Sequence, residues 1–255
     1  WSASELAIAW LDGRETAGAG GHGHEHHGQT EGDDSAMTLR AAVFDGDGKR
    51  RHDWRLDART CDCCQTDSAL TSKGPIVIYR GRDLQEIRDV YSIRHSAGVW
   101  QAPRLVAADN WLMPACPVNG PAIAAAGDAV WAAWYTGAND KPALRVAFSA
   151  DAGVDFSIAK TFASGPHIHG RVDLAADKGG AWLLWLQESG PQSLWLVRLD
   201  KRLQAVSAPV RVAQLQGKGR ATGFARVQAV DGTAYVVWTD IVAGKPALRG
   251  ARVQY

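Results

Sequence analysis

The chain has 255 residues, 46% of them hydrophobic, so it is long enough to bury the core of one or two domains. Its 28 basic and 27 acidic side chains nearly cancel and form no basic stripe, which argues against nucleic acid as a partner. Gly and Asp break its apolar runs well short of the ~18 residues that a membrane span needs, so no transmembrane segment is expected.

A short apolar strand that ends in an aromatic residue and a polar turn recurs along the chain, first at 6–14. The aromatic residues are Trp10, Tyr79, Trp134, Trp185 and Trp238. They lie roughly 50–70 residues apart, and the longest interval becomes ordinary if about 15 residues of the loop at 18–34 are an insertion. Repeats of this length with several strands each are typical of propeller blades.

Further strands follow each of these segments. Apolar and polar residues alternate at 143–149, as in a half-buried strand, and the Gly/Asp turn at 45–48 is typical of a hairpin connection. We therefore expect an all-β propeller that forms a single domain over 1–255. The expected blade repeats are roughly 1–60, 61–109, 110–165, 166–218 and 219–255.

The turn SADAGVDF carries Ser149, Asp151, Gly153 and Phe156 in an S-x-D-x-G-x-x-aromatic pattern. It resembles the Asp box of the sialidase (neuraminidase-like, BNR-repeat) superfamily, and 94–100 is similar in degenerate form. The residues alone indicate a hairpin that an Asp side chain stabilises. The resemblance implies a structural turn away from the active site and a propeller of six blades, of which this chain would hold about five because its N-terminal part is missing.

The motifs CDCC, YRGRD, CPVNGP and GRVD together resemble a group of exported bacterial proteins described as sialidase-like. The resemblance implies the fold and an exported, periplasmic or secreted, location rather than a defined activity. The chain opens without Met, so we expect a processed or trimmed piece whose signal peptide lies outside it.

The loops between blades of a propeller share one face with the loops between the second and third strands of each blade. We call this the interblade-loop face; Asp-box turns lie on the opposite face. All four cysteines, the His-rich insert and an Arg-rich loop fall on the interblade-loop face. Since loops on a rigid scaffold carry most binding and catalytic residues, we expect the functional site there.

Three cysteines, Cys61, Cys63 and Cys64, share one interblade loop, and Cys116 lies in the next. Thiolates at this density suit a soft metal such as Cu(I) or Zn. The alternatives are two disulfides in an exported protein, for example one that joins this loop to Cys116, and free redox thiols.

Histidines on the same face are further candidate metal ligands. The insert carries His22, His24, His26 and His27, whose neutral imidazoles can bind Cu, Ni or Zn. The alternative is a solvated loop that binds metal weakly. His167 and His169 point the same way in an extended segment, which allows two ligands, a ligand and a base, or only a polar loop.

The Arg-rich loop and the starts of two later blades supply arginines. These are Arg80, Arg82, Arg88, Arg171 and Arg220. Sialidases bind the substrate carboxylate with three arginines, because guanidinium matches carboxylate bidentately. The resemblance therefore implies binding of an acidic sugar or another small anion, with Arg88, Arg171 and Arg220 as the cluster. Structural ion pairs between blades are the alternative.

The same resemblance implies catalytic carboxylates, for which Asp83, Glu86 and Asp89 are the candidates. Two features depart from the sialidase pattern: the arginine motif of the first blade is absent, and no Tyr can be assigned as nucleophile. Trp111 is interpreted as a stacking platform for a sugar or as a cover for the core. Asn119 belongs to a Pro-bracketed loop expected to line the central channel.

Two functions from different classes are thus predicted on one face. The first is a glycoside hydrolase or glycan-binding protein for acidic sugars. The second is a periplasmic protein that binds Cu or Zn, or acts in redox chemistry, through the cysteines and nearby histidines. A propeller that holds protein partners is a third hypothesis, and neither the oligomeric state nor the cofactor follows from the residues.

Overall fold

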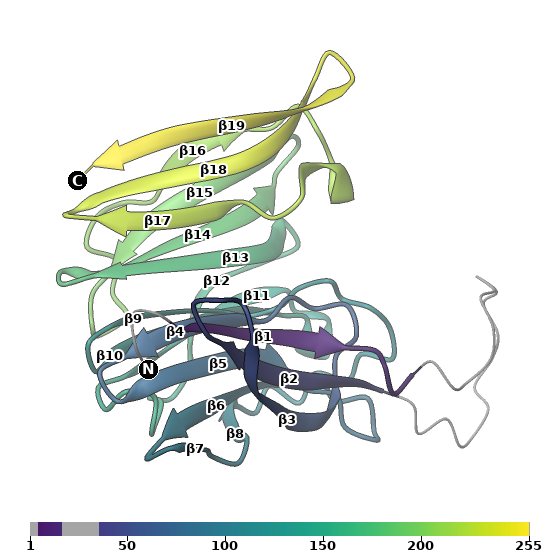
Figure 1. The fold of residues 1–255 in the computed structure, drawn as a ribbon. Coiled ribbons are helices and arrows are strands. Elements are labelled where there is room, and N and C mark those ends of the chain that lie inside the picture. Colours follow the sequence, from purple (N-terminus) through teal and green to yellow (C-terminus); the bar gives the residue numbers. More distant parts are fainter. Residues whose placement is uncertain (1–4, 17–35, 255) are drawn as a thin grey trace.

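A computed structural model of the chain describes residues 5–16 and 36–254, and in these it is built almost entirely of antiparallel strands (Figure 1). The first sheet holds β1 (Leu6–Asp12), β2 (Met37–Phe44) and β3 (Arg50–Thr60). The second holds β4 (Asp67–Thr71), β5 (Gly74–Arg80), β6 (Val90–Ser96), β7 (Val99–Trp100) and β8 (Arg104–Ala107). The third holds β9 (Ala122–Ala126), β10 (Ala129–Thr136), β11 (Ala143–Ser149) and β12 (Lys160–Ser164).

The fourth sheet holds β13 (Ile168–Asp177), β14 (Gly180–Glu188), β15 (Gln192–Leu199) and β16 (Val210–Gln214). The fifth holds β17 (Arg226–Val230), β18 (Thr233–Val242) and β19 (Lys245–Gln254). Two short 3₁₀ turns, η1 (Ala138–Asp140) and η2 (Gly219–Thr222), complete the described elements. The predicted all-β, propeller-like fold is confirmed. No helix among the described residues could cross a membrane.

The hydrophobic core lies between consecutive sheets rather than inside any one of them. Along β10, Trp131 and Ala133 pack toward the fourth sheet, whereas Val130, Ala132 and Trp134 pack toward the second. This strand alternates sides with period two and is buried on both. A buried aromatic of this size removes roughly 150–250 Å² from water, or about 4–6 kcal/mol before entropy, which explains why Trp recurs in the repeats.

Polar side chains on the innermost strands join each sheet to the next. Asp67, at the start of β4, accepts a hydrogen bond from the backbone N–H of Ile123 in β9 (2.8 Å). Asp173 of β13 accepts one from Val227 of β17 (2.6 Å). These contacts set the spacing of neighbouring sheets, and therefore of the loops that connect them.

The turn at 149–156 connects β11 to β12. Asp151 Oδ1 accepts hydrogen bonds from the backbone N–H groups of Val154 (3.0 Å) and Asp155 (3.1 Å), while Ser149 Oγ accepts one from Gly153 (2.9 Å). An Asp side chain holds this hairpin, as the residues indicated.

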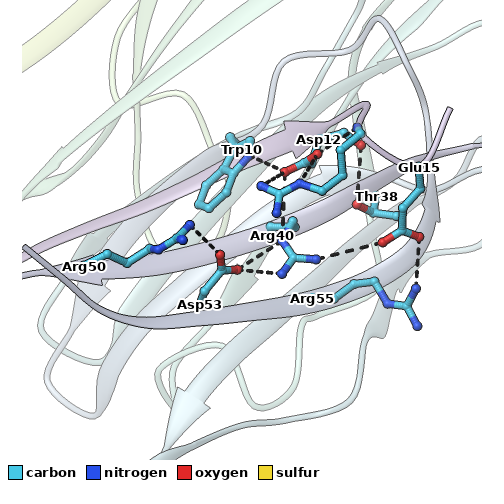
Figure 2. Close-up of polar contacts among 9 residues, drawn as sticks. Trp10, Asp12, Glu15, Thr38, Arg40, Arg50, Asp53 and Arg55 are labelled. Atoms are coloured by element: carbon cyan, nitrogen blue, oxygen red, sulfur yellow. Dashed lines mark hydrogen bonds and ion pairs between the residues drawn. The ribbon is translucent and has the colours of Figure 1, made fainter. Parts of the chain in front are cut away.

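Charged residues on the strands of the first sheet and the turn after β1 form a network of polar contacts (Figure 2). Arg40 of β2 pairs with Asp53 of β3 (2.7 Å), and Glu15 bridges Arg40 (4.0 Å) and Arg55 (3.1 Å). A hydrogen bond from Arg14 is the main reason why the pKa of Asp12 falls to about 2. This network ties together the strand ends on either side of the His-rich insert, whose residues 17–35 lie outside the described part of the chain.

Candidate functional site

The cysteine-bearing loop between β3 and β4 is pinned to the end of β5. The backbone N–H of Cys61 donates to the carbonyl oxygen of Arg80 (3.0 Å), and Thr60 pairs with Gly81 as a β-bridge. These bonds turn Cys61 and Cys64 inward, where they are 1% and 2% exposed, and leave Cys63 half-buried. The loop is therefore an ordered part of the interblade-loop face.

Three sulfur atoms of this loop converge. The Sγ atoms of Cys61 and Cys64 lie 2.8 Å apart and those of Cys61 and Cys63 lie 3.9 Å apart. All three lie within 4.8 Å of one another, the only group of three or more Cys, His or acidic side chains this close in 5–16 and 36–254. We call these residues the thiol cluster.

Cys116 reaches the thiol cluster from the next interblade loop. It is exposed, and its interaction with Cys63 raises the pKa of its thiol. The loop is held there by Gly120, whose N–H donates to the Gln65 side-chain oxygen (2.9 Å). A Cβ on Gly120 would lie 1.9 Å from the Gln65 carbonyl oxygen, so only glycine permits this approach. The glycine of CPVNGP thus sets the distance between the two cysteine loops.

All four cysteines are free thiols in this structure, whereas the sequence left disulfides, metal ligands and free thiols open. The closest pair is Cys61–Cys64, and one loop supplies both residues. The sequence could not show that three sulfurs of one loop turn toward each other.

The protons of these thiols are unequally shared. A hydrogen bond from Cys64 is the main cause that lowers the pKa of Cys63 to about 5 and that of Cys61 to about 7, against the effect of burial. The pKa values of the other two thiols shift upward: that of Cys64 is raised, and the interaction with Cys63 raises that of Cys116 to about 11. Two thiolates held by two thiols are chemically ready to bind a soft cation, since the thiolate is the form that ligates metals.

Arg88 lies beside the thiol cluster and is 3% exposed. Its Nη2 donates to Glu86 Oε2 (2.7 Å), whereas Nε and Nη1 have no hydrogen-bond partner. Burial alone would lower the pKa of Arg88, but the charges of Cys61 and Glu86 raise it overall. A buried guanidinium beside Cys61 also favours the thiolate form of that residue.

The other arginines of the Arg-rich loop are bonded to the protein. Arg80 is 1% exposed and donates to the carbonyl oxygens of Asn119 (2.9 Å), Arg88 (2.6 Å) and Tyr135 (2.7 Å). Arg82 pairs with Asp62 (2.9 Å) and Glu86 (2.8 Å). These contacts are those of structural arginines, which the sequence allowed as the alternative to substrate binding.

Arg171 contacts the segment that carries Arg220. Its Nη1 donates to the carbonyl oxygens of Gly219 (2.7 Å) and Gly223 (2.9 Å), and its guanidinium lies over the Phe224 ring. Arg220 lies in η2, within that segment. Arg171 thus binds the segment at 219–224, whereas Arg88 pairs with Glu86, and a three-arginine carboxylate site remains a prediction.

The candidate catalytic carboxylates have different surroundings. Asp83 caps a turn by accepting from the N–H of Ile87 (2.8 Å), and buried Asp89 accepts from that of Asn110 (3.1 Å), with a pKa raised by burial. Burial raises the pKa of Glu86, but its pairs with Arg82 and Arg88 lower it overall. Of the three, only Glu86 is linked through Arg88 to the thiol cluster.

Trp111 and the histidines surround these loops. Trp111 is 4% exposed, lies under the Arg80 guanidinium and packs edge-on against Tyr135, so it covers the core. The carbonyl oxygen of His169 accepts a hydrogen bond from Asn119 Nδ2 (3.2 Å). The Nε2 atom of His169 lies 3.9 Å from Glu188 Oε2. The His167 carbonyl oxygen accepts from the N–H of Glu188 (2.8 Å). His22, His24, His26 and His27 lie outside the described residues.

Sequence reasoning missed a group of charged side chains on the innermost strands, in which Asp173 is buried and Arg226 is exposed. Arg226 Nη1 lies 3.1 Å from Asp173 Oδ1, and burial raises the pKa of Asp173 to about 7. Asp67 is also nearby, and its pKa is likewise raised by burial. Asp67 and Arg226 stand at the starts of β4 and β17, and no sequence motif marked either residue.

No protein-family model and no curated protein matches the sequence. Among solved structures, the chain is similar to a leech intramolecular trans-sialidase (11% identity, 86% of this chain and 36% of that chain, TM-score 0.50). It is also similar to a NanB sialidase from Streptococcus pneumoniae (9% identity, 86% and 36%, TM-score 0.52). At these identities the likeness shows the propeller fold alone. The chain spans about a third of the length of either sialidase.

Proposed function

We propose that this protein binds a soft metal ion, Cu(I) or Zn(II), through Cys61, Cys63 and Cys64. The observation that carries the proposal is the convergence of their three Sγ atoms within 4.8 Å. Sulfurs that share one ion at ~2.3 Å lie about 4 Å from each other. Small side-chain rotations therefore suffice to bring all three to bonding distance.

Charge and burial support the same assignment. Three thiolates around one Cu(I) leave a net charge of −2, which needs compensation in a buried site. Arg88 lies beside Cys61, and the charge of Arg80 acts on Cys64. These two guanidiniums offset the excess charge and belong to the surroundings that tune a metal site. Arg88 Nε and Nη1 have no hydrogen-bond partner, so they are free to donate to a further cysteine thiolate.

The test is anaerobic loading of untagged, reduced protein with Cu(I) or Zn(II), followed by elemental analysis and a count of free thiols. We expect one tightly held ion per chain with sulfur ligands by X-ray absorption, and its loss in Cys61→Ser and in Cys64→Ser. A control variant in which His22, His24, His26 and His27 are all changed to Ala separates weak metal binding by the insert from tight binding by the thiol cluster. This variant is expected to keep the tightly held ion. A fully reduced chain that takes up neither ion contradicts the proposal.

A second candidate is binding or hydrolysis of an acidic glycan on the same face, in an exported protein. The specific observation in its favour is an open groove of about 580 Å³ beside the Cys116 loop. The groove is lined by Trp111, Met113, Tyr135 and Asp140. Fold likeness to two sialidases is consistent with it. The test is turnover of a fluorogenic sialoside together with binding to sialylated oligosaccharides. Activity that is abolished by Glu86→Gln and by Asp89→Asn supports this candidate. A protein that shows no turnover and no binding excludes it.

A further inference from the structure

The four thiols form a graded series from the interior to solvent. Cys61 and Cys64 are buried, Cys63 is half-buried and Cys116 is exposed. Contacts follow the same order: the Sγ of Cys61 lies 2.8 Å from that of Cys64 and 3.9 Å from that of Cys63, and Cys116 interacts with Cys63 from the next loop. Cys116 is not part of the group of three whose sulfurs all lie within 4.8 Å.

We propose that Cys116 is the exchange ligand of the site, the thiol that takes a Cu(I) ion from a thiolate-bearing carrier and passes it inward to Cys61, Cys63 and Cys64. This inference rests on the proposed metal binding. It assigns the ion as transferred cargo and the partner as a donor or acceptor with its own soft ligands.

The position of Cys116 suits this role because its loop is anchored on both sides. Before it, the N–H of Met113 donates to the Glu86 carbonyl oxygen (3.0 Å). After it, Gly120 is bonded to Gln65 of the cysteine-bearing loop. Cys116 is therefore held beside the cysteine-bearing loop and exposed, where a carrier can reach it, whereas Cys61 and Cys64 are buried.

The transfer is a sequence of ligand substitutions without electron transfer. The Cys116 sulfur forms a bond to Cu(I) while one bond from the ion to a carrier sulfur breaks. The proton that Cys116 loses on binding is taken up by the departing carrier thiolate. Cys63 and Cys61 then replace the remaining carrier ligands, which leave as thiolates. Cys64 replaces Cys116 and gives its own proton to the departing Cys116 sulfur, and the oxidation state of the ion does not change.

The experiment compares Cys116→Ser with wild type and with Cys61→Ser in two measurements. Equilibrium Cu(I) affinity is obtained by competition with a chromogenic Cu(I) chelator, and the transfer rate by stopped-flow mixing of loaded protein with excess chelator or with glutathione. We expect Cys116→Ser to keep the stoichiometry and affinity but to exchange about tenfold more slowly, which corresponds to ~1.4 kcal/mol on the barrier. Cys61→Ser is expected to lose affinity.

Two further variants separate ligand chemistry from loop disturbance. Ala115→Ser, an exposed neighbour, is expected to exchange at the wild-type rate, and Cys116→Met, which restores a soft sulfur, to recover most of it. Equal exchange rates in Cys116→Ser and wild type overturn the proposal. A loss of affinity in Cys116→Ser as large as in Cys61→Ser also overturns it, because Cys116 is then a permanent ligand. Absence of Cu(I) binding by wild type is a different result, which removes the proposed function itself.

Discussion

Arg80 Nε, at the end of β5, donates to the backbone carbonyl oxygen of Asn119, 2.9 Å away in the loop that carries Cys116. One buried side chain of the second sheet thus holds the loop that leads into the third, and Cys61 is bonded to the backbone of the same arginine. Both cysteine loops are positioned by one residue.

Arg80→Met is expected to lower the free energy of unfolding by about 3 kcal/mol or more, since three buried carbonyl oxygens lose a charge-assisted donor. Metal affinity should fall with it. Urea unfolding measures the first effect. Arg104→Met is the control, because Arg104 is 57% exposed and its pair with Asp155 should contribute under about 1 kcal/mol. Equal losses in the two variants would contradict a structural role for Arg80.

At pH 6, iodoacetamide should label Cys63 in the metal-free protein before it labels Cys116, although Cys116 is the more exposed. The pKa of Cys63 is lowered to about 5 and that of Cys116 is raised to about 11, and the thiolate is the reactive form. Above pH 6 Cys63 therefore stays reactive, and Cys116 becomes so only in strong base. Peptide mapping by mass spectrometry reads the order, and labelling of Cys116 first would falsify the assignment.

Arg88→Met should raise the pKa of Cys61 from about 7 toward its ordinary value, because the buried positive charge beside the thiolate is removed. Labelling of Cys61 at pH 7 then becomes slower. Arg82→Met is the matched control, because Arg82 also pairs with Glu86, whereas Arg88 is the arginine whose charge lowers the pKa of Cys61. An unchanged labelling rate of Cys61 in Arg88→Met contradicts the view that the charge of Arg88 lowers the pKa of Cys61.

The free energy of unfolding should fall as pH rises from 4 to 7 through Asp173. The folded protein keeps the Asp173 proton up to about pH 7, whereas the unfolded chain releases it near 3.8, so the stabilising contribution is complete at low pH and is lost as pH rises through the folded pKa. The upper limit is about 4 kcal/mol. Asp173→Asn, which keeps an acceptor for Val227, should flatten the slope between pH 4 and 7 in chemical unfolding; an unchanged slope contradicts it.

Gly120→Ala should destabilise the protein by about 2 kcal/mol or more and weaken metal binding, because the new Cβ overlaps the Gln65 carbonyl oxygen and pushes the two cysteine loops apart. Gly250→Ala in β19 is the control, since its Cβ would have only one neighbour, the Val236 carbonyl oxygen at 3.4 Å. Thermal unfolding and Cu(I) competition together check both effects. A Gly120→Ala protein with wild-type affinity contradicts the positioning role.

The positions of the strands could be predicted from the sequence because each one depends on neighbours close in the chain. The alternation at 143–149 is a local signal of a half-buried strand, and the apolar run at 130–134 with its terminal Trp134 is a local signal of a buried one. The Asp151 turn is equally local, since its donors lie three and four residues away. The free state of the cysteines was not accessible in this way, and the sequence left disulfides, metal ligands and free thiols open.

The sequence by itself determined an all-β chain of repeated sheets, because period-two burial and turn chemistry act over a few residues, and it predicted one face for its cysteines, histidines and arginines. Only the tertiary structure decided which contacts the described ones make. It brought Arg88 beside Cys61, placed Cys116 where it interacts with Cys63, and bonded Arg80 to three carbonyl oxygens. These contacts join different loops, and their distances depend on how the intervening sheets pack, a quantity that no local pattern contains.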